Sequence, residues 1–214
     1  MFHIKHCWAI GISILLFISC SDSDDQGEIS ALIPYKTGNS WTYESTTQGI
    51  QRKNVDLSTT EIGEYVNVKG NKGYRIVGSC SSFIVRNDEN GNAVEVGGYS
   101  GNNTLFAPSV KYKKNAIKGE KWLYNVITED CSYYDDYTPG LFEKRSVFMT
   151  CIHADTLIQT ARGLFKCKAY SYSPDGRSLI YIDYVSDGIG RVKTEHYEDG
   201  LFAGYNELVD YKLN

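Results

Sequence analysis

The residues best suited to binding chemistry lie in a Cys-Ser-Tyr-Tyr-Asp-Asp-Tyr-Thr-Pro-Gly segment near the middle of the chain. Tyr133, Tyr134 and Tyr137 offer aromatic faces on which a sugar ring could stack. The carboxylates of Asp135 and Asp136 could accept hydrogen bonds from sugar hydroxyls. We therefore predict these five residues as candidate ligand contacts. Tyrosine-rich loops also contact proteins, and the same composition fits a well-packed surface loop, so both alternatives stay open.

The sequence lacks the common signatures of catalysis. It contains no Gly-x-Ser-x-Gly elbow, no His-Glu-x-x-His motif and no glycine pattern for phosphates or dinucleotides. Neighbouring carboxylates such as Asp135 and Asp136 could cleave a glycosidic bond, but acids in turns also simply keep a surface soluble. We expect a protein that is not an enzyme and has no cofactor, and we keep a glycosidase as the third hypothesis.

Four cysteines downstream of the N-terminal region are candidates for disulfides: Cys80, Cys131, Cys151 and Cys167. They can pair in three ways if the protein reaches an oxidising compartment. Free thiols are also common in protein cores, so paired and unpaired cysteines both remain open. The spacing contains no Cys-x-x-Cys knuckle, and we expect no metal site.

The first residues resemble the leader of a bacterial lipoprotein. Lys5 precedes a short apolar run that ends at Ile18, long enough for the core of a secretory signal helix and too short to span a bilayer. Ser19 and Cys20 follow like a lipobox, at which the signal is cut and the cysteine is lipidated. The resemblance predicts a signal peptide over residues 1–19 and a membrane anchor on Cys20.

The polar segment after Cys20 begins Ser-Asp-Ser-Asp-Asp and is similar to the signal that sends Bacteroidota lipoproteins to the outer leaflet of the outer membrane. So polar a stretch cannot join a core, and we expect residues 20–28 to be a flexible tether. The similarity implies a protein anchored in the outer membrane and facing the cell exterior. The periplasmic face of that membrane is the alternative.

The overall charge argues against nucleic acid as a partner. The chain of 214 residues has a formal net charge of −4, and its lysines and arginines form no dense cluster. It contains only four prolines and no second low-complexity segment. We therefore expect residues 29–214 to form one domain with its own core.

This domain is expected to be all-β and mostly antiparallel. Apolar and polar residues alternate at 65–69 and 164–172, as in half-buried strands. Further strands are expected at 41–47, 51–57, 74–86, 93–96, 122–128, 142–151, 157–160, 179–184, 191–197 and 207–213. The pairs Asn90-Gly91, Asp175-Gly176 and Asp199-Gly200 suit tight hairpins. The pattern predicts a curled sheet, a half-barrel or a sandwich.

One motif occurs twice. The pattern Gly-x-x-Trp-x-Tyr begins at Gly38 and again at Gly119, 81 residues later. This repetition suggests a domain built from two similar halves. The Trp and Tyr of each copy are two residues apart and so face the same side of a strand. We expect them to pack in the core or at its rim rather than to form a ligand platform.

Segments 35–43, 163–167 and 187–195 resemble a group of uncharacterised Bacteroidota-type surface lipoproteins. These proteins carry a Gly-Asn-x-Trp-x-Tyr motif near the start of the domain and Gly-x-Gly-x-Val-Lys-x-Glu near its end. The resemblance implies a compact β domain outside the inner membrane and carries no catalytic residues. Our leading hypothesis is a non-catalytic surface lipoprotein that binds a glycan or an envelope protein. The alternative is an assembly component whose sheet edge pairs with a partner.

Overall fold

The computed structural model describes residues 31–48, 53–77, 81–100, 103–130, 141–174 and 178–214. These residues contain no helix, and the predicted all-β class is confirmed. The strands are β1 (Ser40–Gln48), β2 (Lys53–Val68), β3 (Asn71–Val77), β4 (Ser82–Asn87), β5 (Ala93–Ser100), β6 (Asn103–Tyr112), β7 (Lys121–Asp130), β8 (Leu141–Thr160), β9 (Gly163–Tyr172), β10 (Leu179–Ser186), β11 (Gly190–Glu198) and β12 (Leu201–Lys212).

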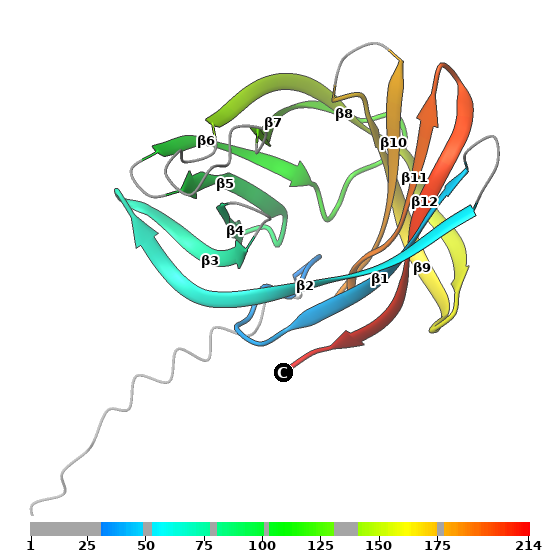
Figure 1. Cartoon of the computed structure of the whole chain (residues 1–214), viewed down its shortest axis with the longest axis horizontal. Helices are drawn as coiled ribbons and strands as arrows, with labels where there is room; N and C mark the ends of the chain where they lie inside the picture. The colour runs from blue at the N-terminus through cyan, green and yellow to red at the C-terminus, as the bar shows by residue number, and fades with distance from the viewer. Residues whose placement is uncertain (1–30, 49–52, 78–80, 101–102, 131–140, 175–177) are drawn as a thin grey trace, which may run out of the picture.

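The strands form one antiparallel sheet in the order β6-β5-β4-β3-β2-β1-β12-β11-β10-β9-β8-β7. Strands that follow one another in the chain pair with each other, except β6 and β7, which are the two edges of the sheet. The pairing of β1 with β12 joins the first half of the sheet to the second. The sheet curls until its two edge strands, β6 and β7, meet (Figure 1). Of the three arrangements expected, the chain therefore adopts a curled and nearly closed sheet.

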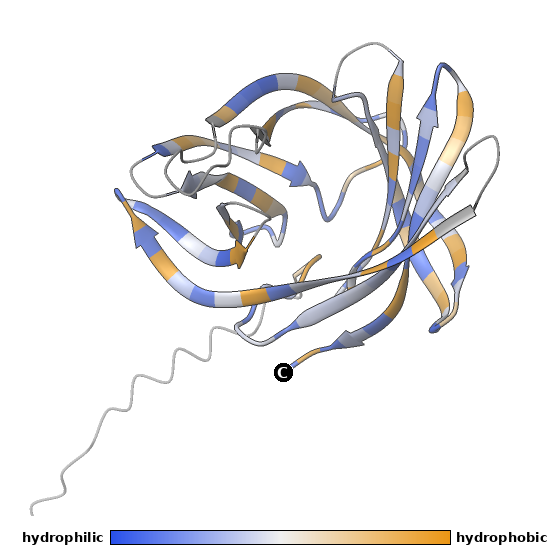
Figure 2. Ribbon diagram, in the orientation of Figure 1, coloured by the Kyte–Doolittle hydropathy of each residue, from blue (hydrophilic) through white to orange (hydrophobic). Residues whose placement is uncertain are grey.

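Hydropathy alternates along the strands, as the banding in Figure 2 shows. In β9, Cys167 and Ala169 are buried while their neighbours Lys166 and Lys168 are more exposed. The main core gathers aromatic and aliphatic side chains from both halves of the sheet, including Trp41, Tyr43, Ile62, Tyr112, Trp122, Tyr124, Met149, Tyr170, Val192 and Leu208. Burial of this inner face is the main stabilising term of the fold.

Four strand predictions differ from the structure. The ranges 51–57 and 65–69, expected as separate strands, both overlap the single strand β2. The range 74–86, expected as one strand, contains the separate strands β3 and β4. The ranges 142–151 and 157–160 belong to one long strand, β8, which is irregular between Cys151 and Thr156. Strand β6 was not expected at all. It contains Pro108, which an edge strand tolerates because an edge position needs no backbone N–H.

Two of the three predicted hairpin turns are confirmed. Gly91 has a φ of 74° between β4 and β5, and Asp199 and Gly200 have φ values of 50° and 77° between β11 and β12. The third pair, Asp175-Gly176, lies outside the described residues. Positive φ at two consecutive residues, as at Asp199 and Gly200, matches the right-handed twist of a hairpin.

The segment before β1 lies inside the curl and links its two halves. Leu32 is fully buried and its N–H donates to the carbonyl of Gly91, 3.1 Å away, in the β4–β5 turn. The N–H of Gly188, in the β10–β11 turn, donates to the carbonyl of Ala31 at 3.2 Å. The side chain of Asn87 donates to the carbonyl of Ile33 at 2.9 Å. The segment thus fixes two distant turns to one another.

The two halves meet at two junctions of different kinds. At the first, β1 and β12 form an antiparallel ladder from Ser40 opposite Lys212 to Thr47 opposite Gly204, with one shift of register between Thr42 and Tyr43. At the second, β6 and β7 lie next to each other as the two edges of the sheet. No backbone ladder joins these two edges among the residues that the structure describes.

Side chains bridge the junction between β6 and β7 instead. The indole N–H of Trp122 donates to the carbonyl of Val110 at 2.9 Å. The backbone N–H of Asn125 donates to the hydroxyl of Ser109 at 3.0 Å, and its side-chain amide donates to the carbonyl of Ala107 at 3.3 Å. These bonds give partners to some of the backbone groups at the two edges that a ladder would otherwise pair.

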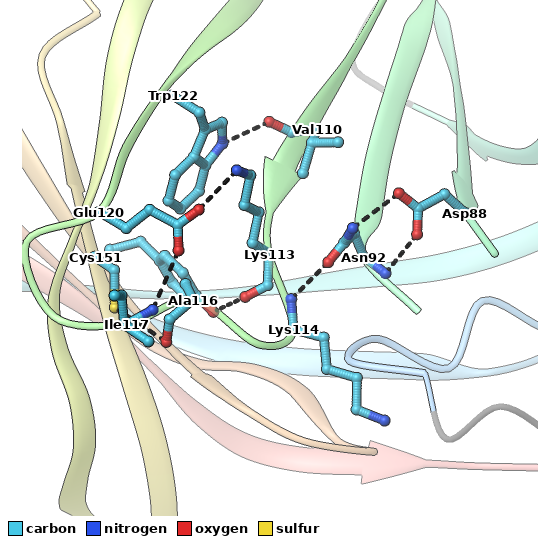
Figure 3. A network of polar contacts seen from close by, with 11 residues as sticks. Asp88, Asn92, Val110, Lys113, Lys114, Ala116, Ile117, Glu120, Trp122 and Cys151 are labelled. Carbon is cyan, nitrogen blue, oxygen red and sulfur yellow. Dashed lines mark hydrogen bonds and ion pairs between the residues drawn. The ribbon is translucent and has the colours of Figure 1, made fainter. Parts of the chain in front are cut away.

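The loop between β6 and β7 is also held by polar contacts (Figure 3). Glu120 accepts hydrogen bonds from the ammonium of Lys113 at 2.7 Å and from the N–H of Ile117 at 3.2 Å. The N–H of Lys114 donates to the side-chain oxygen of Asn92 at 2.8 Å. The loop is therefore fixed to itself and to the β4–β5 turn.

Candidate functional site

A pocket of about 280 Å³ lies inside the curl of the sheet. Strands β1 to β7, strand β11 and the segment before β1 all contribute to its wall. Most of the wall is aliphatic or aromatic, and its aromatic side chains are Tyr35, Trp41, Tyr43, Phe83 and Tyr112. Three charged residues, Glu95, Lys111 and Arg191, interrupt this apolar lining. A mostly apolar pocket with a few polar groups is the usual form of a small-molecule site.

A β-bulge turns Arg191 toward the pocket. Tyr184 lies opposite Lys193, but the next residue, Val185, lies opposite Arg191, so Val192 is an extra residue in β11. Residues directly opposite one another share a face of the sheet, and Val185 is fully inside. The bulge therefore directs the Arg191 side chain inward, which is a common use of such irregularities near sites.

The guanidinium of Arg191 lies 4.8 Å from the centre of the Tyr43 ring, as in a cation–π contact. The hydroxyl of Tyr43 donates to the Arg191 carbonyl at 2.9 Å. Burial disfavours the charge of Arg191, but the nearby Tyr43 and Asp183 outweigh this effect and raise its pKa. Arg191 is thus a permanent cation in the wall of the pocket.

Asp183 is a fully buried carboxylate whose two oxygens are both occupied. One oxygen accepts from the hydroxyl of Tyr112 and the other from the hydroxyl of Thr194, each at 2.6 Å. Burial, with Asp183 as a second cause, raises the pKa of Tyr112 well above 10.0. Tyr112 therefore keeps its proton and acts only as a donor to Asp183.

A second bulge turns Lys111 into the pocket. Ala93 lies opposite Tyr112 and Val94 lies opposite Val110, so Lys111 is the extra residue of β6. In a regular strand, adjacent residues point to opposite faces, yet Lys111 and Tyr112 both line the pocket. The irregular pairing of β5 with β6 accounts for this arrangement.

Lys111 and Glu95 form a pair inside the wall. The ammonium of Lys111 lies 3.7 Å from a carboxylate oxygen of Glu95, and the same oxygen accepts from the hydroxyl of Tyr124 at 2.9 Å. Burial, with Glu95 as the next cause, raises the pKa of Tyr124 well above 10.0. Lys111 thus already has a carboxylate partner in the protein.

The repeated Trp and Tyr residues are all buried, as expected. Trp41 and Tyr43 of the first copy are 4% and 5% exposed, and Trp122 and Tyr124 of the second are 9% and 2% exposed. Trp41 donates to the carbonyl of Ile189 at 2.7 Å. Trp41 and Tyr43 pack in the core and also form part of the pocket wall.

The predicted ligand contacts Tyr133, Tyr134, Asp135, Asp136 and Tyr137 lie outside the described residues. The lipidation site, the tether and the signal peptide lie outside them as well. These assignments stay predictions.

Two of the four candidate disulfide cysteines, Cys80 and Cys131, are also outside the described residues. The other two, Cys151 and Cys167, are buried free thiols. The thiol of Cys167 donates to the carbonyl of Phe165 at 3.6 Å, and burial raises its pKa to about 12. These two cysteines are therefore not bonded to each other in the structure, and both are protonated at neutral pH.

The described part of the chain contains neither a candidate metal site nor a candidate membrane-spanning helix. It brings together no group of three or more His, Cys, Asp or Glu side chains that could hold a metal ion. It also contains no helix with the length and apolar character needed to cross a membrane.

The three charged residues of the pocket, Glu95, Lys111 and Arg191, were not among the predicted site residues. Asp183, which lies beside the pocket, is the single carboxylate in the otherwise apolar and aromatic run 179–185, and this pattern could have marked it as buried. Lys111 and Arg191 face inward because of bulges, and a regular alternation would assign them to the outer face. Glu95 has no signal that separates it from a solvated strand residue.

Protein-family models and curated proteins gave no match to the chain. Among solved structures, it is similar to a "putative lipoprotein" from Parabacteroides distasonis ATCC 8503, with 15% identity, 86% of this chain and 99% of that chain covered, and a TM-score of 0.40. It is also similar to a "putative exported protein with YmcC-like fold" from Bacteroides fragilis NCTC 9343, with 13% identity, 86% and 100% covered, and a TM-score of 0.41.

Proposed function

We propose that the protein is a lipid-anchored, non-catalytic binding protein of the cell envelope that takes one ring of a glycan into its interior pocket. The observation that carries this proposal is a pocket that combines aromatic walls with inward-facing charged groups. A sugar ring has an apolar C–H face and a rim of hydroxyls, so its binding site needs both apolar side chains and polar or charged groups. The pocket supplies both.

The size of the pocket limits the ligand. Its volume of about 280 Å³ lies just below the range of ~300–1,000 Å³ that is usual for pockets that hold drug-sized ligands. One ring fits such a volume better than a folded oligosaccharide does. We therefore expect a terminal or free monosaccharide unit rather than an internal segment of a chain.

The location is the part of the proposal that rests on sequence. The lipobox at Cys20 and the acidic segment that follows favour an anchor in the outer membrane, with the domain facing outward. Two acyl chains are enough to hold a protein stably on a membrane. Intact-mass measurement of the exported protein tests this part, because an unmodified Cys20 would contradict it.

The edge-pairing alternative receives less support from the fold. The two edge strands, β6 and β7, face one another, and three hydrogen bonds from β7 side chains or backbone already use acceptors on β6. The described part of the sheet therefore offers no long bare edge to a partner strand.

The binding proposal is tested with two variants of adjacent residues on β3. Ile76 lines the pocket, whereas Val77 points outward and is 67% exposed. Ile76→Phe fills the pocket and is expected to abolish binding in a monosaccharide panel, measured by calorimetry on the full chain in detergent. Val77→Phe adds a phenyl ring to the outer face and is expected to leave binding unchanged.

Each result has a distinct meaning. Absence of monosaccharide binding by the wild-type protein would overturn the proposed function. Binding that survives in Ile76→Phe, with the same affinity as in Val77→Phe, would show that the ligand binds outside this pocket. Release of a shortened sugar during the titration would contradict the non-catalytic role.

A further inference from the structure

We infer that the ligand is acidic, namely a sugar ring with a carboxylate that pairs with the guanidinium of Arg191. This inference rests on the proposed function and adds the chemical class of the ligand. It follows from the way in which the charged groups of the pocket are paired.

The two carboxylates nearest the pocket already have their partners. Both oxygens of Asp183 accept short hydrogen bonds from Tyr112 and Thr194. Glu95 accepts from Tyr124 and lies 3.7 Å from the ammonium of Lys111. Neither carboxylate therefore needs a hydrogen-bond donor from a ligand to satisfy it.

Arg191 differs from the other charged residues of the pocket. It belongs to none of the ion pairs found among the described residues, whereas Lys111 is paired with Glu95. A guanidinium has five N–H donors, and the hydroxyl of Tyr43 can accept from one of them. Arg191 lines the pocket, so a ligand there can reach the remaining donors.

A carboxylate is the ligand group that matches this cation. The planar guanidinium binds a carboxylate through two parallel hydrogen bonds, which fixes both the position and the orientation of the ligand. Asp183 lies close enough to stabilise the charge of Arg191 but is held by other donors, so it keeps Arg191 charged without blocking it. The ring of the ligand then lies against the aromatic and aliphatic wall.

The probes are D-glucuronate, its methyl ester and D-glucose, which share one ring and differ only at the sixth carbon. Calorimetry on the full chain in detergent is expected to show that glucuronate binds about 30-fold more tightly than glucose, as expected for charge-assisted hydrogen bonds. The methyl ester, which has no charge, is expected to bind like glucose. The ester tests the charge without any change to the protein.

Variants of the protein test the role of Arg191. Arg191→Gln is expected to reduce the preference for glucuronate over glucose to about 3-fold or less, and Arg191→Lys, which keeps the charge but not the planar fork, is expected to lie between. Arg162→Gln is the control, because Arg162 is exposed and pairs with Asp210 at 2.8 Å. This control is expected to retain the full preference.

The outcomes separate the inference from the proposed function. If the wild-type protein binds glucose and glucuronate equally, the ligand is a neutral sugar and the inference is wrong, while the proposed function stands. If it binds neither of these probes, the inference is wrong, and if it also binds no sugar of the monosaccharide panel, the proposed function is wrong as well. A preference for glucuronate that persists in Arg191→Gln would show that another group holds the carboxylate. If Arg191→Gln fails to fold, the ester and Arg191→Lys still decide the question.

Discussion

The two halves of the sheet are joined at two junctions, and the hydrogen bonds at these junctions are of different kinds. At the junction of β1 with β12, an antiparallel backbone ladder with a single shift of register joins the two strands. At the junction of β6 with β7, two edges meet without a ladder among the described residues, and the bonds come largely from side chains. One curled sheet thus contains a junction that backbone geometry fixes and another that depends on the identity of a few residues.

The repeated motif shows how this difference arises. Both β1 and β7 follow a glycine with positive φ and begin with a buried Trp and Tyr. The indole of Trp41 donates to Ile189, outside the ladder that its own strand forms with β12. The indole of Trp122 donates to Val110 directly across the open junction. The same motif therefore contributes differently at the two junctions. Trp122 forms a hydrogen bond across the junction of β6 with β7, whereas Trp41 forms none across the junction of β1 with β12.

The largest effect is expected from Gly204→Ala in the ladder of β1 with β12. A methyl group at this position would lie 2.3 Å from the carbonyl oxygen of Thr46, which is backbone and cannot move aside without breaking the pairing. We expect the free energy of unfolding, measured in urea, to fall by about 3 kcal/mol.

Gly200→Ala is the matched control for that variant. Gly200 also has a positive φ, of 77°, but no atom lies within 4 Å of the added methyl group. Only backbone strain of about 1 kcal/mol is expected there. Equal losses in the two variants would contradict the importance of close packing at this junction.

An intermediate effect is expected from Trp122→Phe, which removes the indole N–H at the junction of β6 with β7. The carbonyl of Val110 loses its partner, and we expect a loss of about 1–2 kcal/mol in the free energy of unfolding. Hydrogen exchange is expected to accelerate at the amide of Asn125, which is bonded across the same junction.

Trp41→Phe provides the comparison with the first junction. It removes a similar hydrogen bond, to Ile189, and a similar loss of stability is expected. Amides in the ladder of β1 with β12 are expected to stay protected, because that ladder does not depend on the indole. Faster exchange along β1 in Trp41→Phe would show that both junctions rely on their tryptophans.

The smallest effect is expected from pH and the loop that joins β6 to β7. The hydrogen bonds from Lys113 and Ile117 lower the pKa of Glu120 below its ordinary value of 4.5. A lowered pKa stabilises the folded protein above that ordinary value, and the gain is lost as the pH falls through the folded pKa.

Glu120→Gln is therefore expected to be less stable than the wild type at pH 7, by less than about 1 kcal/mol, since partly exposed ion pairs contribute little. The difference is expected to shrink when unfolding is measured at successive pH values below 4.5. Glu89→Gln, at an exposed turn residue, is the control. A difference in the free energy of unfolding between the wild type and Glu120→Gln that stays constant down to pH 3 would argue against the contribution of the Glu120 charge.

Local patterns predicted those parts of the fold in which neighbouring residues decide the outcome. The alternation in β9 and the Asp199-Gly200 turn are examples, because strand period and turn geometry are properties of a few consecutive residues. Strand β6 escaped prediction because Pro108 argues against a strand in the sequence. Its place at an edge depends on a sheet that closes only when the whole chain has folded.

The pocket could not be predicted for a related reason. The inward position of Arg191 depends on the single extra residue Val192, and that of Lys111 depends on its own bulge in β6. A bulge results from the register of two strands, and register is set by contacts between residues far apart in the chain. The sequence pattern therefore identified the core aromatic residues but not the charges beside them.

The segment before β1 gives the domain a mechanical property. It lies directly after the predicted tether, is bonded to the β4–β5 and β10–β11 turns, and supplies Ile33 and Tyr35 to the pocket. Any force that pulls on the chain before Ala31 therefore acts first on the wall of the pocket and only later on the strands. In a protein attached through its N-terminus, the same short segment would both carry the tension on the attachment and line the pocket that a ligand occupies.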